Sequence, residues 1–262
     1  MTLTDTHSHL YEPEFDDDRD EAVGRALDAG VTTMLLPAID SASHSRMFSL
    51  AQKYPGAFRT MMGLHPTSVN DNPRWRDELA EVGRLLESPP EGIRFVGVGE
   101  IGLDFYWSQD FQQEQAEAFR AQCEMALQHN LPIAVHTRNA YDMMVEIIED
   151  FRGTGLRGVF HAFNEPAETY RRLRSCGDFV FGIGGVVTYK RAHIAQTVTE
   201  MPLDDIVLET DCPSLTPVPY RGKRNESAYV VHVCRRVAEL KGIGEDVVAA
   251  ATTANAARIF GL

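Results

Sequence analysis

The chain has 262 residues, of which 44% are hydrophobic and 24% are charged, so it has the composition of a globular protein with a sizeable core. This length suits one large α/β domain or two ordinary domains. The formal net charge of −13 argues against binding of long duplex DNA through a wide basic face, but it allows a small cationic pocket or a metal site.

Neither a membrane span nor a secretory leader is expected. The chain contains no run of about 18 apolar residues, and its N-terminus runs directly into Thr4-Asp5-Thr6-His7. The four cysteines are widely spaced and form no Cys-x-x-Cys pair: Cys123, Cys176, Cys212 and Cys234. This spacing indicates reduced thiols with a packing role, and we therefore expect a cytoplasmic protein.

Short apolar or β-branched segments alternate with longer amphipathic ones, which is the pattern of repeated βα units. Strands are predicted at residues 3–7, 31–36, 58–64, 95–100, 133–136, 158–161, 179–183 and 206–209. Helices are predicted at residues 16–29, 110–129 and 141–151, the second with a capping box of Asp110 and Gln113. Residues 226–262 predict two or three more helices, the last beginning near Thr252 and ending at Gly261.

The number of strands predicts the fold class. Eight parallel strands, each followed by a helix, in a chain of about 250 residues are typical of an α/β TIM (β/α)8 barrel. No linker, low-complexity segment or internal repeat interrupts the chain, so a single domain over residues 1–262 is expected. In this fold the chemistry lies at the C-terminal ends of the strands.

Histidines and carboxylates stand at those ends. His7 and His9 are two residues apart, so they would lie on one face of a strand and could bind one metal ion. The later strands end in His65, Glu100, His136, His161, Glu209 and Asp211. Such groups are costly inside a barrel unless a ligand satisfies them, and a pair of divalent ions would do so and could activate a water for hydrolysis.

Structural interpretations remain open for several of these residues. His65 before Pro66 could be a turn residue, His136 and His161 could be polar strand ends, and Glu209 could support a ligand without binding metal. Four other histidines are expected in solvated or packing positions: His44, His129, His193 and His232. Residues 97–102 match the G-x-G-x-x-G spacing, but no helix follows the last glycine, so these glycines are expected to let the backbone pass close to a metal pocket.

Six motifs together resemble the TatD-related deoxyribonucleases. They are Asp5-Thr6-His7-Ser8-His9-Leu10, Gly63-Leu64-His65-Pro66, Gly99-Glu100-Ile101-Gly102-Leu103-Asp104, Pro132-Ile133-Ala134-Val135-His136, Leu208-Glu209-Thr210-Asp211-Cys212-Pro213 and Arg221-Gly222-Lys223-Arg224-Asn225-Glu226. The similarity extends from residue 5 to the Thr252-Thr253-x-Asn255 tail. It implies a barrel of the amidohydrolase type, divalent metals and hydrolysis, commonly at DNA 3′ ends.

The resemblance also implies roles by position. His7, His9 and Asp211 would bind one metal ion, Glu100 would bridge two ions, and His136 with His161 would complete the second site. His65 would lie beside the phosphate or the leaving group. This chain departs from the family after His161, where Ala-Phe-Asn-Glu-Pro replaces the usual Cys-Phe-Ser-Gly, and at Ser227, where proline is usual. Both departures are expected on loops that shape the substrate pocket.

The resulting hypothesis is a metal-dependent deoxyribonuclease that cleaves single-stranded or frayed DNA as a 3′ exonuclease. Asp211 would orient and deprotonate the attacking water, with Glu100 and His65 as the other catalytic residues and two ions of magnesium, manganese or zinc. Candidate phosphate contacts are Arg138, Lys190, Arg221, Lys223 and Arg224. The aromatic segment 105–107 either stacks a base or belongs to the core.

Two alternatives compete with this hypothesis. The same site could hydrolyse a small phosphoester, ester or amide, or the chain could be a non-catalytic metal-binding protein. The sequence leaves the oligomeric state open, a monomer included.

Overall fold

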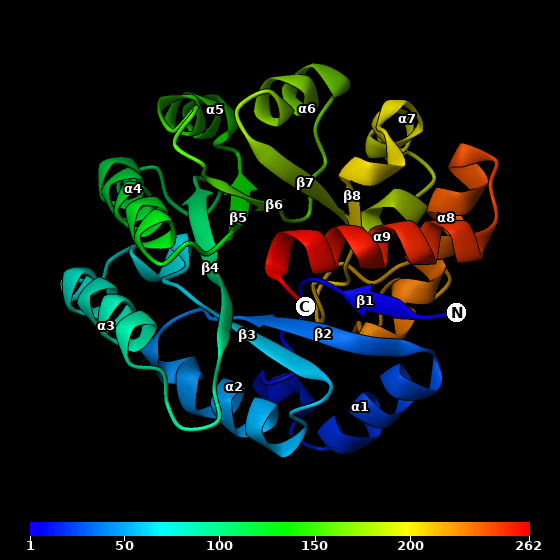
Figure 1. Ribbon diagram of the computed structural model, residues 1–262, viewed down its shortest axis with the longest axis horizontal. Helices are drawn as coiled ribbons and strands as arrows, with labels where there is room; N and C mark the ends of the chain where they lie inside the picture. The colour runs from blue at the N-terminus through cyan, green and yellow to red at the C-terminus, as the bar shows by residue number, and fades with distance from the viewer.

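The computed structural model describes residues 1–262. Its eight strands form one parallel sheet in sequential order from β1 to β8. The strands are β1 (Leu3–Asp5), β2 (Val31–Pro37), β3 (Phe58–Met62), β4 (Phe95–Asp104), β5 (Ile133–Arg138), β6 (Arg157–Phe160), β7 (Asp178–Ile183) and β8 (Ile206–Leu208). The sheet curls into the predicted (β/α)8 barrel, with the strands at the centre and the helices outside them (Figure 1).

One helix follows each of the first seven strands, and two follow the eighth. They are α1 (Arg19–Asp28), α2 (Ser41–Lys53), α3 (Trp75–Glu87), α4 (Gln112–Gln128), α5 (Tyr141–Asp150), α6 (Ala167–Arg174), α7 (Ile194–Glu200), α8 (Val230–Lys241) and α9 (Glu245–Phe260). None of these helices is both long and apolar enough to cross a lipid bilayer. The four cysteines are buried and unpaired, as expected.

The barrel closes between β1 and β8 through the segments that follow these strands. The Thr6 N–H donates to the Leu208 carbonyl at 3.0 Å, and the Asp211 N–H donates to the His7 carbonyl at 2.9 Å. The His9 N–H donates to the Cys212 carbonyl at 2.9 Å. Closure therefore sets the His-x-His segment directly beside Asp211.

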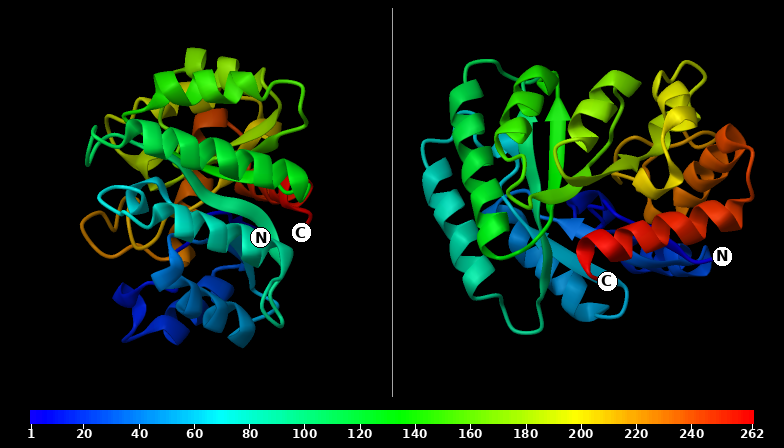
Figure 2. Two further views of the ribbon diagram at one scale, coloured as in Figure 1. Left: turned by 90° about the vertical axis from the view of Figure 1, so that its left-hand side faces the viewer. Right: turned by 45° about the horizontal axis from the view of Figure 1, so that its top comes forward.

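Helix α9 closes the opposite end of the barrel. One buried apolar residue from each of strands β2 to β8 forms a cluster with three residues of α9: Leu35, Met61, Val96, Ala134, Val159, Val180, Val207, Ala256, Ile259 and Phe260. Figures 1 and 2 show α9, in red, crossing that end. Because apolar side chains fill this end, polar groups in the interior are confined to the end where the strands finish.

Two glycines of β4 allow a close approach to β5. A Cβ on Gly102, whose φ is +145°, would lie 1.9 Å from the His136 carbonyl oxygen, and a Cβ on Gly99 would lie 2.6 Å from the Ala134 Cβ. The glycine-rich segment is thus a strand in close contact with its neighbour. This contact brings Glu100 of β4 beside His136 of β5.

Some predicted boundaries were wrong. The last helix begins at Glu245, after Gly244, and not near Thr252. The capping box of Asp110 and Gln113 is absent, because α4 begins after Phe111 and no side chain caps it. The sequence analysis predicted a helix after each strand but gave no bounds for α2, α3, α6 and α7, which lie between strands as the barrel topology requires.

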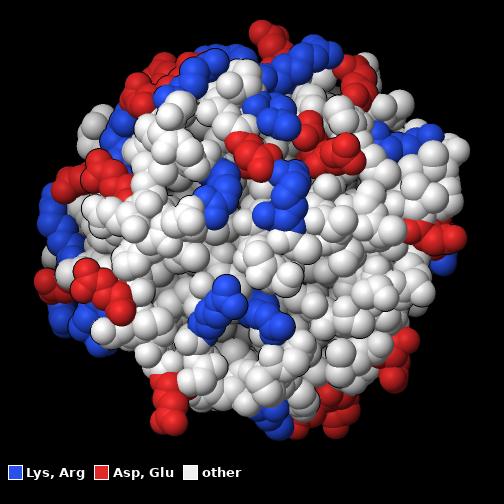
Figure 3. All heavy atoms as spheres, viewed as in Figure 1, with Lys and Arg blue, Asp and Glu red and all other residues white.

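The charged residues form no continuous basic face on the side of the molecule that α9 crosses. In Figure 3, Lys and Arg side chains alternate with Asp and Glu around the edge of that side, and a few separate charged groups lie nearer its middle with uncharged surface between them. On this side of the molecule, the distribution agrees with the expectation drawn from the net charge of −13.

Candidate metal centre

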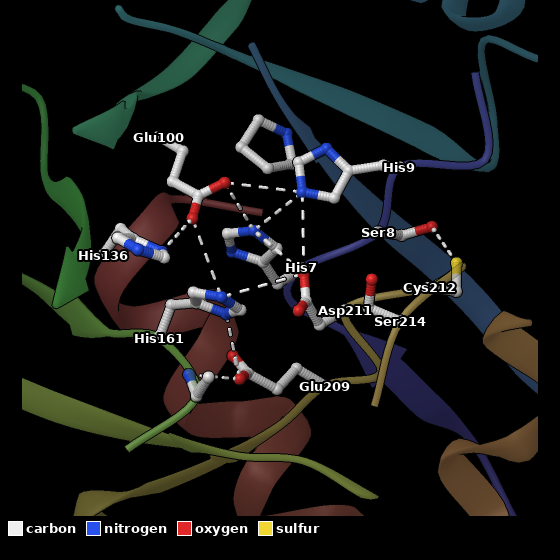
Figure 4. A network of polar contacts seen from close by, with 12 residues as sticks. His7, Ser8, His9, Glu100, His136, His161, Glu209, Asp211, Cys212 and Ser214 are labelled. Atoms are coloured by element: carbon white, nitrogen blue, oxygen red, sulfur yellow. Dashed lines mark hydrogen bonds and ion pairs between the residues drawn. The ribbon is translucent and has the colours of Figure 1, made fainter. Parts of the chain in front are cut away.

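Six side chains that the sequence predicted as metal ligands meet at the C-terminal end of the barrel. They are His7 and His9 after β1, Glu100 in β4, His136 in β5, His161 after β6 and Asp211 after β8. Figure 4 shows them pointing toward one another. Five of them line a cavity of about 290 Å³ together with His65, and His7 is fully buried behind them.

One group of ligand atoms surrounds a point between β1, β4 and β8. The His7 Nε2 lies 3.1 Å from both the His9 Nε2 and the Glu100 Oε2. The Asp211 Oδ1 lies 3.8 Å from the His7 Nε2 and 3.6 Å from the His9 Nε2. Ligand atoms about 2.1 Å from a tetrahedral ion are about 3.4 Å apart, so these four side chains fit one ion, and we name them the first cage.

A second group of ligand atoms lies on the other side of Glu100. Its Oε1 is 2.9 Å from the His136 Nδ1 and 3.7 Å from the His161 Nε2. The His161 Nε2 is in turn 3.7 Å from the Asp211 Oδ1. We name Glu100, His136, His161 and Asp211 the second cage. Since each Glu100 oxygen faces a different cage, its carboxylate has the arrangement of a bridge between two ions.

Tyr11 determines which nitrogen of His9 is free to bind a metal. The Tyr11 hydroxyl donates to the Pro37 carbonyl at 2.6 Å, since a carbonyl can only accept. The same hydroxyl oxygen lies 2.9 Å from the His9 Nδ1, so it accepts the Nδ1 proton. The Nε2 of His9 is therefore the unprotonated nitrogen, and it faces the first cage.

Buried carboxylates orient the two histidines of the second cage in the same way. The Asp104 Oδ2 lies 2.9 Å from the His136 Nε2, which leaves the Nδ1 to face Glu100. The Glu209 Oε1 lies 3.0 Å from the His161 Nδ1 and accepts the Ala162 N–H at 2.5 Å. Glu209 thus has the supporting position that the sequence left open, and the ring nitrogen that each histidine turns to the cage is fixed.

The electrostatics of the cluster favour a cation. Burial alone would lower the histidine pKa values, but Glu209, Asp211 and Glu100 outweigh it and raise the pKa of His161 to about 10. Hydrogen bonds to Asp104 and Glu100 likewise overcome burial and raise the pKa of His136 to about 9. The buried carboxylates therefore hold positive charge at both histidines.

The donor set fits two divalent ions. The His7 Nδ1 is buried without a hydrogen-bond partner, and its Nε2 faces a ring nitrogen of His9 that carries no proton. With the His7 proton on its Nδ1, the Nε2 atoms of His7 and His9 both turn lone pairs to the first cage, and a cation between them satisfies both. Nitrogen and carboxylate oxygen donors without a thiolate suit zinc or manganese, and the carboxylates also suit magnesium.

His65 differs from the cage histidines in its protonation. Its Nδ1 accepts a hydrogen bond from the Thr67 N–H at 3.2 Å, so its Nε2 carries the proton of the neutral ring. That Nε2 lies 3.5 Å from the Glu100 Oε1, at the wall of the cavity. His65 is therefore both a turn residue, capping the 3-10 helix that begins at Pro66, and a potential proton donor in the site.

Of the predicted phosphate contacts, Arg138 alone lines the site. It borders a groove of about 470 Å³ that adjoins the cavity and shares His136, His161 and Asp211 with it. The other four do not line the cavity or the groove: Lys190, Arg221, Lys223 and Arg224. The Arg224 guanidinium pairs with Asp18 at 2.6 Å and lies over the Phe15 ring.

The two departures from the family pattern lie in different surroundings. Ala162 and Asn164 line the groove, as expected for a loop that shapes the pocket. Ser227 does not line it, and that expectation was wrong. Ser227 is fully buried, with its hydroxyl 3.0 Å from that of Ser8, because the short helix that begins at Ser227 packs against α1 and β2.

The sequence interpretation missed two supporting residues, although spacing could have found both. Asp104 stands four residues after Glu100 in the same strand, on the same face. Tyr11 continues the spacing of two from His7 and His9. In each case the supporting side chain follows a predicted ligand of its own segment by an even number of residues.

A barrel with a histidine and carboxylate cluster of this kind at its C-terminal end defines a metal-dependent hydrolase. The family model described as TatD related DNase matches residues 4–261. The chain therefore belongs to the TatD-related DNase family, as its motifs predicted.

Individual relatives agree over the full length. The chain is 36% identical to an uncharacterized metal-dependent hydrolase, YabD, of Bacillus subtilis, covering 98% of each chain. It is 32% identical to the 3′-5′ ssDNA/RNA exonuclease TatD of Erwinia tasmaniensis, covering 99% of this chain and 100% of the other. The crystal structure of the TatD homologue YJJV from Escherichia coli matches with a TM-score of 0.90 and 27% identity, over 99% of this chain and 98% of that chain.

Proposed function

We propose that this protein hydrolyses phosphodiester bonds at the 3′ ends of single-stranded DNA, with two divalent ions of magnesium, manganese or zinc. The proposal rests on Glu100, whose two carboxylate oxygens face different cages. Its Oε2 lies 3.1 Å from the His7 Nε2, and its Oε1 lies 2.9 Å from the His136 Nδ1. The names of related exonucleases support the choice of substrate.

The first ion would be held by His7, His9, Glu100 and Asp211, and the second by Glu100, His136, His161 and Asp211. Bound there, two divalent ions lower the pKa of a water and neutralise charge on the phosphate. The chain's own residues orient the reactants and move the protons.

Asp211 is placed to act as the general base. The Asp211 side chain is 19% exposed and the Glu100 side chain 3%, so Asp211 is the more accessible of the two cluster carboxylates that line the cavity. It would accept a proton from the attacking water. His65, whose Nε2 carries a proton at the cavity wall, would donate to the leaving oxygen or to the phosphate.

The shape of the site supports a single strand or a frayed end. The cavity and the groove share His136, His161 and Asp211, so a chain end could reach the cages from the groove. A paired duplex would have to open before its end entered. We further propose that residues 1–262 act as one hydrolase domain, and that it works in the cytoplasm, where its four unpaired thiols would stay reduced.

The size of the cavity favours a second candidate. About 290 Å³ also accommodates a small phosphoester or ester, and the same cages could polarise a carbonyl group. Turnover of a small phosphoester or an ester without any release of nucleotides from DNA would support this candidate over the first.

The test measures nucleotide release from 5′-labelled single-stranded DNA by the metal-free protein after addition of magnesium, manganese or zinc. Asp211→Asn should lower kcat by about 10²-fold to 10⁴-fold, and Glu100→Gln should lower it at least as far, with unchanged circular dichroism. Asp28→Asn and Glu87→Gln, at exposed helical positions, are the matched controls. Cleavage of DNA by Asp211→Asn at the wild-type rate would contradict the mechanism, and a wild-type protein inactive on DNA with every ion would contradict the substrate.

A further inference from the structure

Two exposed aromatic side chains follow β4 and lie next to Arg138, which lines the groove. Tyr106 and Trp107 lie in the segment between β4 and α4 and are 51% and 68% exposed, whereas Phe105 before them is buried. Their rings meet edge to face, with centroids 5.0 Å apart. Large aromatic side chains are costly to leave in water, so an exposed pair beside a catalytic pocket indicates a binding surface.

Asp104 fixes this pair relative to the metal centre. One oxygen of Asp104 lies 2.9 Å from the His136 Nε2, and the other accepts the Tyr106 N–H at 3.0 Å. The Phe105 N–H donates to the Arg138 carbonyl at 2.9 Å. The Asp104 carboxylate thus links the Tyr106 backbone to His136 of the second cage. The aromatic segment is therefore bound to β4 through Asp104 and to β5 through the Arg138 carbonyl.

Arg138 adds a cation to the aromatic pair. Its guanidinium lies 3.5 Å from the centroid of the Tyr106 ring and 5.6 Å from that of Trp107. Arg138 is exposed and forms no ion pair with an acidic side chain, unlike Arg224, which pairs with Asp18. Its donors are therefore available to a phosphate group.

The walls of the site differ in charge. Glu12 and Glu14 line the cavity, whereas Arg138 lines the adjoining groove. One acidic residue outside the metal centre, Glu165, also lines the groove. A polyanion whose end is in the cages would be repelled on the side of Glu12 and Glu14 and would run along the side of Arg138.

We propose that Tyr106, Trp107 and Arg138 form a subsite for one unpaired nucleotide of a single strand, next to the bond that is cleaved. The base stacks on the exposed ring of Trp107, with Tyr106 as the edge of the platform, and Arg138 binds the adjoining phosphate. Stacking is tolerant of base identity, so the subsite favours unpaired bases over paired ones without selecting a sequence. This inference rests on the proposed nuclease function and specifies how that function selects single strands.

The binding test measures the fluorescence of Trp107. The chain has two tryptophans, and the other, Trp75, is 5% exposed. In the Asp211→Asn protein, which holds substrate without cutting it, a single-stranded oligothymidylate should quench the tryptophan fluorescence. The same protein carrying Trp107→Phe reports Trp75 alone and should show no quenching. Equal quenching with and without Trp107 would overturn the subsite.

The kinetic test separates stacking from charge. Base stacking on an aromatic ring contributes about 1–3 kcal/mol, so Trp107→Leu should raise KM for a single-stranded oligonucleotide about 5-fold to 150-fold while kcat changes little. Trp107→Phe keeps an aromatic face and should lie close to wild type. Val247→Ala, an exposed apolar site on α9, is the matched control.

A substrate lacking bases completes the test. On an oligonucleotide whose terminal nucleotides are abasic, Trp107→Leu and wild type should have the same KM, whereas Arg138→Ala should raise KM on both substrates. If Trp107→Leu has the wild-type KM on the normal oligonucleotide, the subsite is absent although the nuclease function stands. If wild type cleaves neither oligonucleotide, the nuclease function and the subsite fail together.

Discussion

Asp104 should control the affinity of the second cage, although it does not face an ion. Its carboxylate is buried and lies 2.9 Å from the His136 Nε2, so it fixes the ring with the Nδ1 turned to Glu100. Loss of such a supporting group typically weakens metal binding 10-fold to 100-fold, or about 1.4–2.7 kcal/mol. We expect Asp104→Leu to weaken binding of one ion by this factor.

The first cage provides an internal comparison. The ring nitrogens that His7 and His9 turn to it have no contact with Asp104, but the two cages share Glu100 and Asp211, so the affinity for the other ion should fall by a smaller factor than the affinity of the second cage. Asp104→Asn keeps an oxygen that can accept the Nε2 proton but loses the charge, and it should fall between Asp104→Leu and wild type.

The assay is calorimetric titration of the metal-free protein with manganese or zinc, with Asp28→Leu as the control for an exposed aspartate. Circular dichroism checks that each variant is folded. Binding of two ions to Asp104→Leu with wild-type affinity would refute the positioning role of Asp104. Equal weakening of both ions would instead indicate a general loss of structure.

Three further substitutions test residues that lie around the site but do not bind the metal ions. Gly102→Ala places a Cβ 1.9 Å from a backbone oxygen of β5 and should lower the free energy of unfolding, measured in urea, by about 3 kcal/mol or more. The control Gly24→Ala has open space around it in α1 and should raise that free energy by about 0.5–1 kcal/mol. Tyr11→Phe leaves two buried polar groups without a partner and should cost about 1–3 kcal/mol in the same titration, so a wild-type midpoint would contradict its role. Arg224→Ala should leave KM for DNA unchanged but cost up to about 1 kcal/mol at pH 7. Hydrogen bonds from Arg224 and Arg25 lower the pKa of Asp18 well below its ordinary value, so this difference should be constant above about pH 4 and should shrink progressively as the pH falls below about 4. A difference that does not shrink at all as the pH falls would exclude the ion pair as its source.

The sequence predicted the barrel and the convergence of its ligands because both follow from local patterns. Eight apolar segments at regular intervals determine the fold class, and a polar residue directly after each segment must lie at one end of a parallel barrel. His7, Glu100, His136 and Asp211 are such residues, and they meet as the pattern required. Their positions depend on strand direction alone.

Features that depend on contacts between distant segments could not be predicted in this way. Ser227 was expected on a pocket loop but is buried against Ser8, because the chain after β8 packs against α1 and β2. Arg224 lies in a basic loop, yet its guanidinium pairs with Asp18, 206 residues away in sequence. The sequence of the basic loop does not show whether Arg224 faces the substrate or another loop. The role of Arg224 therefore depends on its tertiary pairing with Asp18.

Barrel closure explains how the first cage is assembled. Asp5, the last residue of β1, accepts hydrogen bonds from the Thr210 N–H at 2.9 Å, the Thr210 hydroxyl at 2.6 Å and the His7 N–H at 3.3 Å. Burial nevertheless raises the pKa of Asp5 to about 7, so as the pH rises from about 4 to 7 this carboxylate makes the folded state less stable relative to the unfolded chain. Ionised Asp5 therefore lowers the stability of the fold at neutral pH. Its three hydrogen bonds instead hold the backbone next to His7 beside the backbone next to Asp211, where β1 and β8 form no regular ladder. The first cage depends on these hydrogen bonds because His7 and His9 follow the first strand, whereas Asp211 follows the last.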